Sequence, residues 1–189
     1  MVNRREEIMK PFTGIGDDGK TSSLGGKRIW KDSIRVETFG TIDESASAIG
    51  LARSFVDHVN VAKLLLMIEE DLYVVGANIA THINNENFGM NIPRINKMIE
   101  RLEKEAIKYN KNLNPLTKFI ITGGLREASF IHLARCIVRR AERRMISLSR
   151  IDEVNPKIIV YFNRLSSLLF VLARYLSKEA QFEEHPVKK

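Results

Sequence analysis

Arginine is the residue type of this chain best suited to binding a ligand, because five arginines fall within residues 132–144. The apolar residues between them keep a helical period, and an α-helix turns by about 100° per residue. One arc of this helix therefore carries five polar side chains: His132, Arg135, Arg139, Glu142 and Arg143. A guanidinium that flanks a buried face needs a carboxylate or phosphate partner, so Arg135 and Arg139 indicate a ligand site or a subunit interface. Arg140 and Arg144 point away from the apolar stripe and are expected to be exposed to solvent.

A glycine-rich segment, residues 14–27, is the second group suited to chemistry. Glycines let backbone N–H groups converge on phosphate oxygens, and lysine, threonine and serine add charge and donors. Residues 14–21 satisfy the Gly-x4-Gly-Lys-Thr pattern of a P-loop, but that loop must follow a buried strand and open a helix. Neither Lys10-Pro11 nor residues 22–26 fit those elements, so the P-loop fold is excluded. Phosphate binding and a flexible entry arm both remain open.

Asp43 is a candidate partner for the arginines. A helix is expected to begin at Thr41, since Thr41 and Glu44 have the spacing of a capping box. Asp43 then lies in the first turn and shares a face with Ser47 and Gly50, where another helix could approach closely. The alternative is a carboxylate that only stabilises the helix N-terminus, by about 0.3–1 kcal/mol.

Five segments with helical period must position these residues. Their apolar stripes cover residues 42–56, 61–79, 92–109, 131–148 and 158–176, with a loop near 84–91. Pro93 is expected in the first turn of the third helix, Gly123-Gly124 precede the fourth, and Asn155-Pro156 open the last. No segment alternates as a strand. The chain is predicted to be all-α: an extended glycine-rich N-terminal arm (1–40), an antiparallel five-helix bundle (41–180) and a frayed tail (181–189).

The composition of the chain limits the number of domains, the compartment and the kinds of ligand that can be expected. A chain of 189 residues with 44% hydrophobic and 28% charged residues suits one globular domain. The single cysteine, Cys136, cannot form an intrachain disulfide, and no apolar run resembles a signal peptide or a membrane span. A cytoplasmic protein that binds no membrane is therefore expected. The net charge of +7 suits either a solvated surface or a polyanionic ligand.

Four stretches appear in a specific order: the arm, residues 35–44 (Arg-Val-Glu-Thr-Phe-Gly-Thr-Ile-Asp-Glu), the arginine helix, and residues 163–166 (Asn-Arg-Leu-Ser). Together they resemble the ATP:cob(I)alamin adenosyltransferases of the propanediol-utilisation type, over roughly residues 12–175. The resemblance implies an enzyme that transfers the 5′-deoxyadenosyl group of Mg-ATP to cob(I)alamin, giving adenosylcobalamin and triphosphate. It also implies a homotrimer with ATP between subunits, a corrinoid reductase and a B12-dependent acceptor enzyme as partners.

The resemblance also implies roles for particular residues. Contacts to ATP from the arm would come from Thr13, Gly16, Asp17, Gly19, Lys20, Thr21 and Lys31. Arg139 would bind the phosphates, helped by Glu142 and Arg143, and Asn163 would contact the nucleotide from the last helix. Arg135 would pair with Asp43 across the interface, and these two with Arg139 form the expected catalytic set. Phe119 would line the corrinoid pocket and exclude the lower axial ligand of cobalt. No residue is assigned to a metal, since Mg²⁺ would be carried by the ATP phosphates.

Some positions depart from that family's usual pattern: Gly14, Thr122, Arg126-Glu127 and Ser167. These departures concern the phosphate and corrinoid contacts rather than the fold. Two other functions stay open. One is a non-catalytic ATP-binding or B12-escort homologue. The other is a basic helical module that binds nucleic acid, which the position of Arg135 and Arg139 beside the apolar stripe disfavours.

Overall fold

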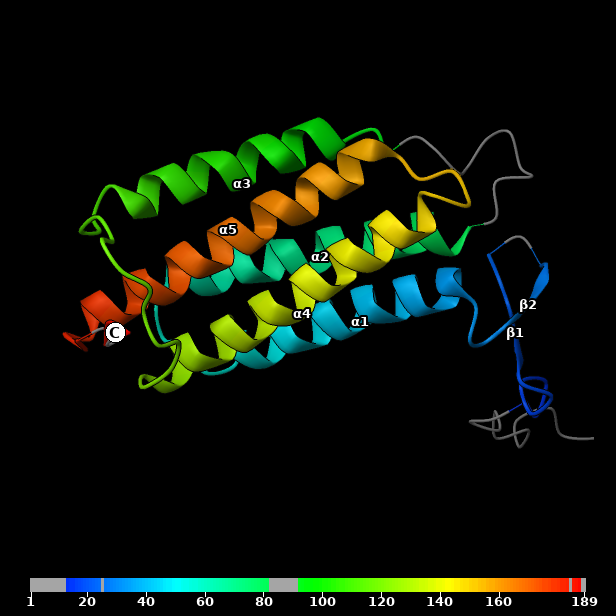
Figure 1. Cartoon of the computed structure of the whole chain (residues 1–189), viewed down its shortest axis with the longest axis horizontal. Coiled ribbons are helices and arrows are strands. Elements are labelled where there is room, and N and C mark those ends of the chain that lie inside the picture. Colours follow the sequence, from blue (N-terminus) through cyan, green and yellow to red (C-terminus); the bar gives the residue numbers. More distant parts are fainter. Residues whose placement is uncertain (1–12, 25, 82–91, 184, 188–189) are drawn as a thin grey trace, which may run out of the picture.

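Five helices and a small hairpin make up the computed structural model, which describes residues 13–24, 26–81, 92–183 and 185–187. The helices are α1 (Ile34–Arg53), α2 (Val59–Ala80), α3 (Ile95–Asn110), α4 (Arg126–Leu148) and α5 (Pro156–Glu179). They lie side by side in a bundle, and the hairpin of β1 (Lys20–Ser22) and β2 (Arg28–Trp30) lies beyond the N-terminal end of α1 (Figure 1). The predicted all-α bundle is confirmed. The loop expected near residues 84–91 lies outside the described residues.

The core forms because each predicted apolar stripe faces a neighbouring helix. α1 packs on α2 and α4, and α5 packs on α3 and α4. The stripe residues of α4 and α5, such as Val138, Met145, Phe162 and Leu169, are fully buried. Each such side chain contributes about 1.5–3 kcal/mol by leaving water. Among the described helices only α5 has the length and hydropathy of a membrane span, and half of that window is buried in the bundle, as expected of a central core helix.

The predicted start of the first helix is wrong. α1 begins at Ile34, where the side chain of Ser33 accepts a hydrogen bond from the Val36 N–H and caps the helix. Thr41 lies in the helix interior, and its hydroxyl donates to the Glu37 carbonyl (2.7 Å) instead of capping. Asp43 therefore lies beyond the first turn, so stabilisation of the helix N-terminus is excluded as its role.

Pro93 precedes α3 rather than standing in its first turn, because the helix begins at Ile95. The start signals of the last two helices are confirmed: α4 follows the glycine pair, and Asn155 caps α5 with Pro156 at its first position.

The expectation of no strands is wrong for the arm. β1 and β2 are antiparallel, with Thr21 opposite Ile29. Three residues on each strand are too few for an alternating pattern to be visible in the sequence.

The expected frayed tail also differs from the structure. Residues 185–187 pair with residues 119–121: the Ile121 N–H donates to the His185 carbonyl, and the Val187 N–H donates to the Phe119 carbonyl, both at 2.8 Å. Phe182 packs against Gly124. Residues 182, 185 and 187 of the tail are thus held by backbone hydrogen bonds and an aromatic contact to the segment that precedes α4.

Candidate functional site

The arm brings four of its predicted nucleotide contacts, Gly16, Asp17, Gly19 and Lys31, together in one turn, while Lys20 and Thr21 follow in β1. The Asp17 N–H donates to the Gly14 carbonyl (3.1 Å), the Gly19 N–H to the Gly16 carbonyl (3.3 Å), and the Lys31 N–H to the Gly19 carbonyl (3.0 Å). Gly14 and Gly19 have φ of 72° and 78°, a left-handed conformation that glycine adopts without strain. The sequence order alone did not show that Lys31 returns to the turn; the hairpin brings it there.

Two lysines and an ion pair between Asp18 and Arg28 lie beside this turn. The Lys20 ammonium lies 4.6 Å from the centre of the Trp30 ring, and the Lys31 Nζ lies so close to Gly16 that a Cβ there would be 3.1 Å away. Asp18 accepts hydrogen bonds from Arg28 (2.6 Å) and from the Lys20 N–H (3.0 Å). These bonds, that of Arg28 first, lower the pKa of the Asp18 carboxyl. A glycine turn flanked by two lysines has the donors and the charge that bind phosphate.

A second polar cluster lies on adjoining turns of α4 and α5. The Asn163 amide donates to Glu142 Oε1 (3.3 Å), and Arg143 Nη1 donates to the Arg139 carbonyl (3.2 Å). Among the described residues no hydrogen bond or ion pair is made by the Arg139 guanidinium, which is exposed to solvent. The structure thus brings together four predicted site residues, and Arg139 has its donors available for an anionic ligand.

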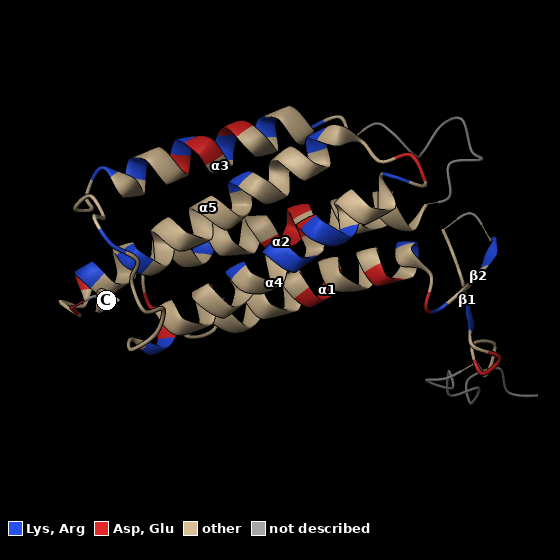
Figure 2. Ribbon diagram, viewed as in Figure 1, with Lys and Arg blue, Asp and Glu red and all other residues tan. Residues whose placement is uncertain are grey.

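Arg140 and Arg144 differ from the expectation of plain exposure. Arg140 pairs with Glu44 of α1, and Arg144 Nε lies 3.3 Å from Glu37 Oε1. The arginines remain about two-fifths exposed, so these pairs contribute little to stability. Figure 2 shows the basic residues of α4 beside the acidic residues of α1. The two pairs show that α1 and α4 run antiparallel, since the later residue of α4 pairs with the earlier residue of α1.

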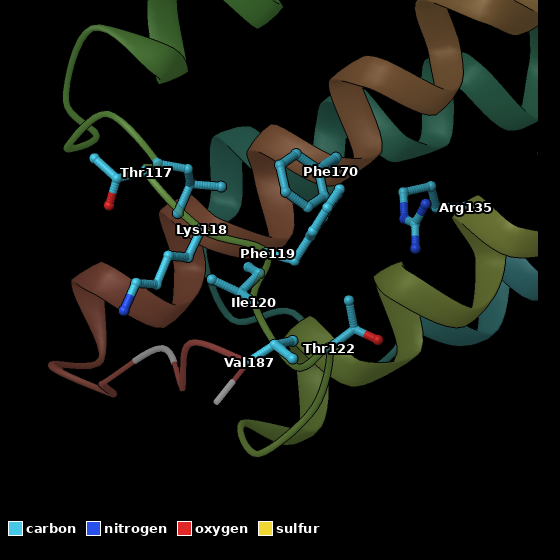
Figure 3. Close-up of a pocket in the computed structure, with 9 residues that line it drawn as sticks. Thr117, Lys118, Phe119, Ile120, Thr122, Arg135, Phe170 and Val187 are labelled. Atoms are coloured by element: carbon cyan, nitrogen blue, oxygen red, sulfur yellow. The ribbon is translucent and has the colours of Figure 1, made fainter. Parts of the chain in front are cut away.

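A pocket of about 790 Å³ opens at the other end of the bundle. It is lined by Leu116, Thr117, Lys118, Phe119, Ile120, Thr122, Arg135, Phe170 and Val187. Phe119 is 86% exposed, so it is not part of the hydrophobic core of the bundle. In Figure 3, Phe119 and Phe170 lie together on one side of the hollow and Arg135 on the other. The pocket therefore combines an apolar surface with the positively charged guanidinium of Arg135 on the opposite side.

Phe170 and Val187 were not identified from the sequence, and His132 was named there only as a polar residue on the arc of the arginine helix. Phe170 and Val187 line the pocket, and His132 packs against Phe170 with the ring centres 5.8 Å apart. His132 is buried, and burial, aided by the charge of Arg135, lowers its pKa to about 4. The only sequence signal was the position of His132 three residues before Arg135. Nδ1 of His132 and Nε of Arg135 have no hydrogen-bond partner among the described residues.

The two halves of the predicted site, the arm and the pocket that Phe119 and Arg135 line, lie far apart within one chain. Because Arg140 pairs with Glu44 and Phe130 stacks on Phe55, Arg135 lies level with about residue 49 of α1. From Ser33, where the arm ends, that is about 25 Å along the helix at 1.5 Å per residue. No contact within the described chain joins Asp43 to Arg135. Asp43 instead borders a 250 Å³ hollow between α1 and α2.

These features define a helical-bundle protein that has a glycine turn flanked by lysines in its arm and a separate, mainly apolar pocket at the other end of the bundle. Residues 11–176 match the family model described as Cobalamin adenosyltransferase. The chain therefore belongs to the cobalamin adenosyltransferase family.

Individual relatives agree with this assignment. The chain is 36% identical over 173 residues to the corrinoid adenosyltransferase of Bacillus subtilis, covering 89% of this chain and 87% of the relative. It is 34% identical over 192 residues to the human corrinoid adenosyltransferase MMAB, covering 96% and 74%. Among solved structures it is similar to a variant of the PduO-type ATP:corrinoid adenosyltransferase from Lactobacillus reuteri complexed with cobalamin and ATP. The TM-score is 0.88, with 29% identity and coverage of 94% of this chain and 99% of that chain.

Proposed function

We propose that the chain transfers the 5′-deoxyadenosyl group of ATP to the cobalt of cob(I)alamin and releases triphosphate. Membership of the cobalamin adenosyltransferase family supports this reaction. The observation that carries it in this chain is the exposed ring of Phe119 on the wall of a large, mainly apolar pocket with Arg135 opposite. A contiguous apolar surface in an open pocket marks a ligand-binding site, and the corrinoid ring is a ligand of suitable size for it.

The corrinoid is the substrate that this pocket would bind. Phe119 would lie below cobalt and keep water and bases from its lower face, which makes cobalt easier to reduce to Co(I). Phe170 and Val187 extend the apolar wall. The low polarity of the wall would also strengthen electrostatic interactions of Arg135 with a bound ligand.

The nucleotide would be bound by the arm together with the α4 and α5 cluster. Thr13, Gly16, Asp17, Gly19, Lys20, Thr21 and Lys31 would contact ATP from the arm, with Mg²⁺ carried by its phosphates. Arg139 would bind the triphosphate because its guanidinium is exposed and makes no ion pair with a described residue. Glu142, Arg143 and Asn163 would position it.

The reaction is an in-line displacement. The electron pair of Co(I) forms the Co–C bond at the 5′ carbon, the C–O bond breaks, and its electron pair leaves with the triphosphate oxygen. Because Co(I) is already a strong nucleophile, no general base is required. The protein has to align the two substrates, which can supply about 7–11 kcal/mol of the barrier. Arg139 and the lysines would stabilise the charge that grows on the leaving oxygen.

We also propose a homotrimer with ATP between subunits, as the family resemblance implies, and the distance between the arm and the Phe119 pocket supports a site shared by two subunits. An arm about 25 Å from the pocket along α1 can meet it more readily in a neighbouring subunit than in its own chain. The face of α1 and α2 around Asp43 exposes large apolar residues, namely Leu51, Leu66, Tyr73 and Val74. Arg135 of one subunit would enter the hollow beside Asp43 of the next. We expect this assembly in the cytoplasm, with a corrinoid reductase and a B12-dependent acceptor enzyme as partners.

The test is an anaerobic reaction of the protein with Mg-ATP and chemically reduced cobalamin, followed by the loss of the cob(I)alamin spectrum and by light-sensitive product. Arg139→Ala should remove almost all activity. Arg140→Ala is the matched control, because Arg140 lies on the same helix but already pairs with Glu44. Equal loss in both variants would contradict the role of Arg139. ATP binding by the wild type without product would favour the escort function instead.

A further inference from the structure

One buried arginine lies where the arm joins the bundle. Arg35 is 6% exposed, in the first turn of α1. Its Nη1 donates to the carbonyls of Ile79 (2.7 Å) and Thr81 (3.3 Å), and its Nη2 donates to Asp152 Oδ2 (2.5 Å). A single guanidinium therefore links the start of α1, the C-terminal end of α2 and the connection between α4 and α5.

The arm docks on the same end of α2. The last carbonyls of a helix have no partner within the helix and must find one elsewhere. The carbonyl of Ala80, which lies between those that Arg35 binds, accepts a hydrogen bond from the Leu24 N–H (3.1 Å). Leu24 also forms a parallel bridge with Thr81. Arg35 and the arm thus share three consecutive carbonyls at the end of α2.

We propose that Arg35 is a positioning residue for the nucleotide arm. By holding the carbonyls on either side of Ala80, it fixes the direction in which the Ala80 carbonyl points and so the place where the β1–β2 hairpin docks. Asp152 holds the other side of the guanidinium, and its own Oδ1 accepts from the Glu153 N–H (2.9 Å). The functional part of this proposal rests on the proposed function, in which the arm binds ATP.

Arginine suits this position better than lysine. Its planar fork presents several N–H donors at fixed angles and stays charged at all relevant pH values, so it can bind two carbonyls and a carboxylate at once. A lysine ammonium is a point charge on a flexible stem. Arg35→Lys should therefore recover part, and not all, of the effect of removing the side chain.

The experiment compares the wild type with Arg35→Met and Arg35→Lys. The matched control is Arg101→Met, because Arg101 also forms a half-buried pair, with Asp71, but links α3 to α2 away from the arm. Hydrogen–deuterium exchange is measured on the peptide that contains Leu24, together with the Kd for ATP, kcat at saturating ATP and the KM for cob(I)alamin.

We expect Arg35→Met to raise exchange at Leu24 and to weaken ATP binding by about tenfold, which corresponds to about 1.4 kcal/mol. Once ATP is saturating, kcat should stay within about twofold of the wild type, since the catalytic groups are intact. The KM for cob(I)alamin should not change. Arg101→Met should leave Leu24 exchange and ATP affinity as in the wild type, whatever it does to stability.

A second variant separates arm docking from folding, because Arg35→Met leaves Asp152 without its guanidinium. Replacing both partners, Arg35→Met with Asp152→Leu, removes that uncompensated charge and should recover much of the stability. Fast exchange at Leu24 should persist, since the carbonyls of Ile79 and Thr81 still lack their donor. Wild-type exchange at Leu24 in both variants would overturn the proposal. If the wild type bound no ATP, the proposed function would fail, and Leu24 exchange would still decide whether Arg35 holds the arm.

Discussion

Acid should destabilise this protein through His132 in particular. The side chain is buried, and its pKa falls from 6.5 to about 4, first because of burial and then because of the charge of Arg135. Between these two values the unfolded chain binds a proton that the folded protein does not. Stability is therefore present in full above pH 6.5 and is lost as the pH falls toward 4. At 1.36 kcal/mol per pH unit the whole loss amounts to about 3 kcal/mol, and about 2 kcal/mol of it falls between pH 7 and pH 5.

The assay is urea unfolding at pH 7 and pH 5 for the wild type and for His132→Phe, at equal protein concentration. Carboxylates also titrate in this range, so the informative quantity is the difference between the two proteins. The free energy of unfolding of the wild type should fall by about 2 kcal/mol more than that of the variant. His185→Gln is the control, since His185 is exposed, and it should keep the wild-type pH dependence. An identical pH dependence in His132→Phe and wild type would refute this reasoning.

Three further substitutions test other parts of the molecule. Phe119→Ala should reduce turnover from cob(II)alamin more than turnover from chemically prepared cob(I)alamin, and equal losses would contradict its role below cobalt. Gly124→Ala should destabilise the fold by about 1–3 kcal/mol and raise the KM for corrinoid. Its φ is 99°, and a Cβ there would meet the ring of Phe182; an unchanged melting temperature would argue against this contact. Tyr161→Phe should cost about 1.5–3 kcal/mol in urea unfolding without changing the KM for ATP, because it removes a buried hydrogen bond to Asp71.

The bundle was predictable because its helices carry continuous apolar stripes. Gly123-Gly124 and Asn155-Pro156 marked the starts of α4 and α5 correctly. The start of α1 was not predictable in the same way, since its first turn includes Arg35, a charged residue that is buried with hydrogen-bond partners in α2 and at Asp152. Such partners come from distant parts of the chain and leave no periodic pattern.

The sequence predicted many of the candidate site residues, but it did not predict how the fold arranges them in space. The nucleotide contacts in the arm and around Arg139 were named from the family resemblance, and the structure brings Gly16, Gly19 and Lys31 together in the arm and Asn163 beside Glu142. The pocket around Phe119 also needs Phe170 from α5 and Val187 from the C-terminal segment, which only the folded chain brings together. Pairing of Asp43 with Arg135 remains a prediction, because it requires a second subunit.

The most direct test of the proposed reaction follows the carbon that is transferred. The protein would be mixed anaerobically with chemically reduced cobalamin and ATP that carries ¹³C at the 5′ position. We predict that the label appears in the carbon bound to cobalt and that one intact triphosphate is released for each adenosylcobalamin. Release of ADP, or bound ATP with no label on cobalt, would contradict the account.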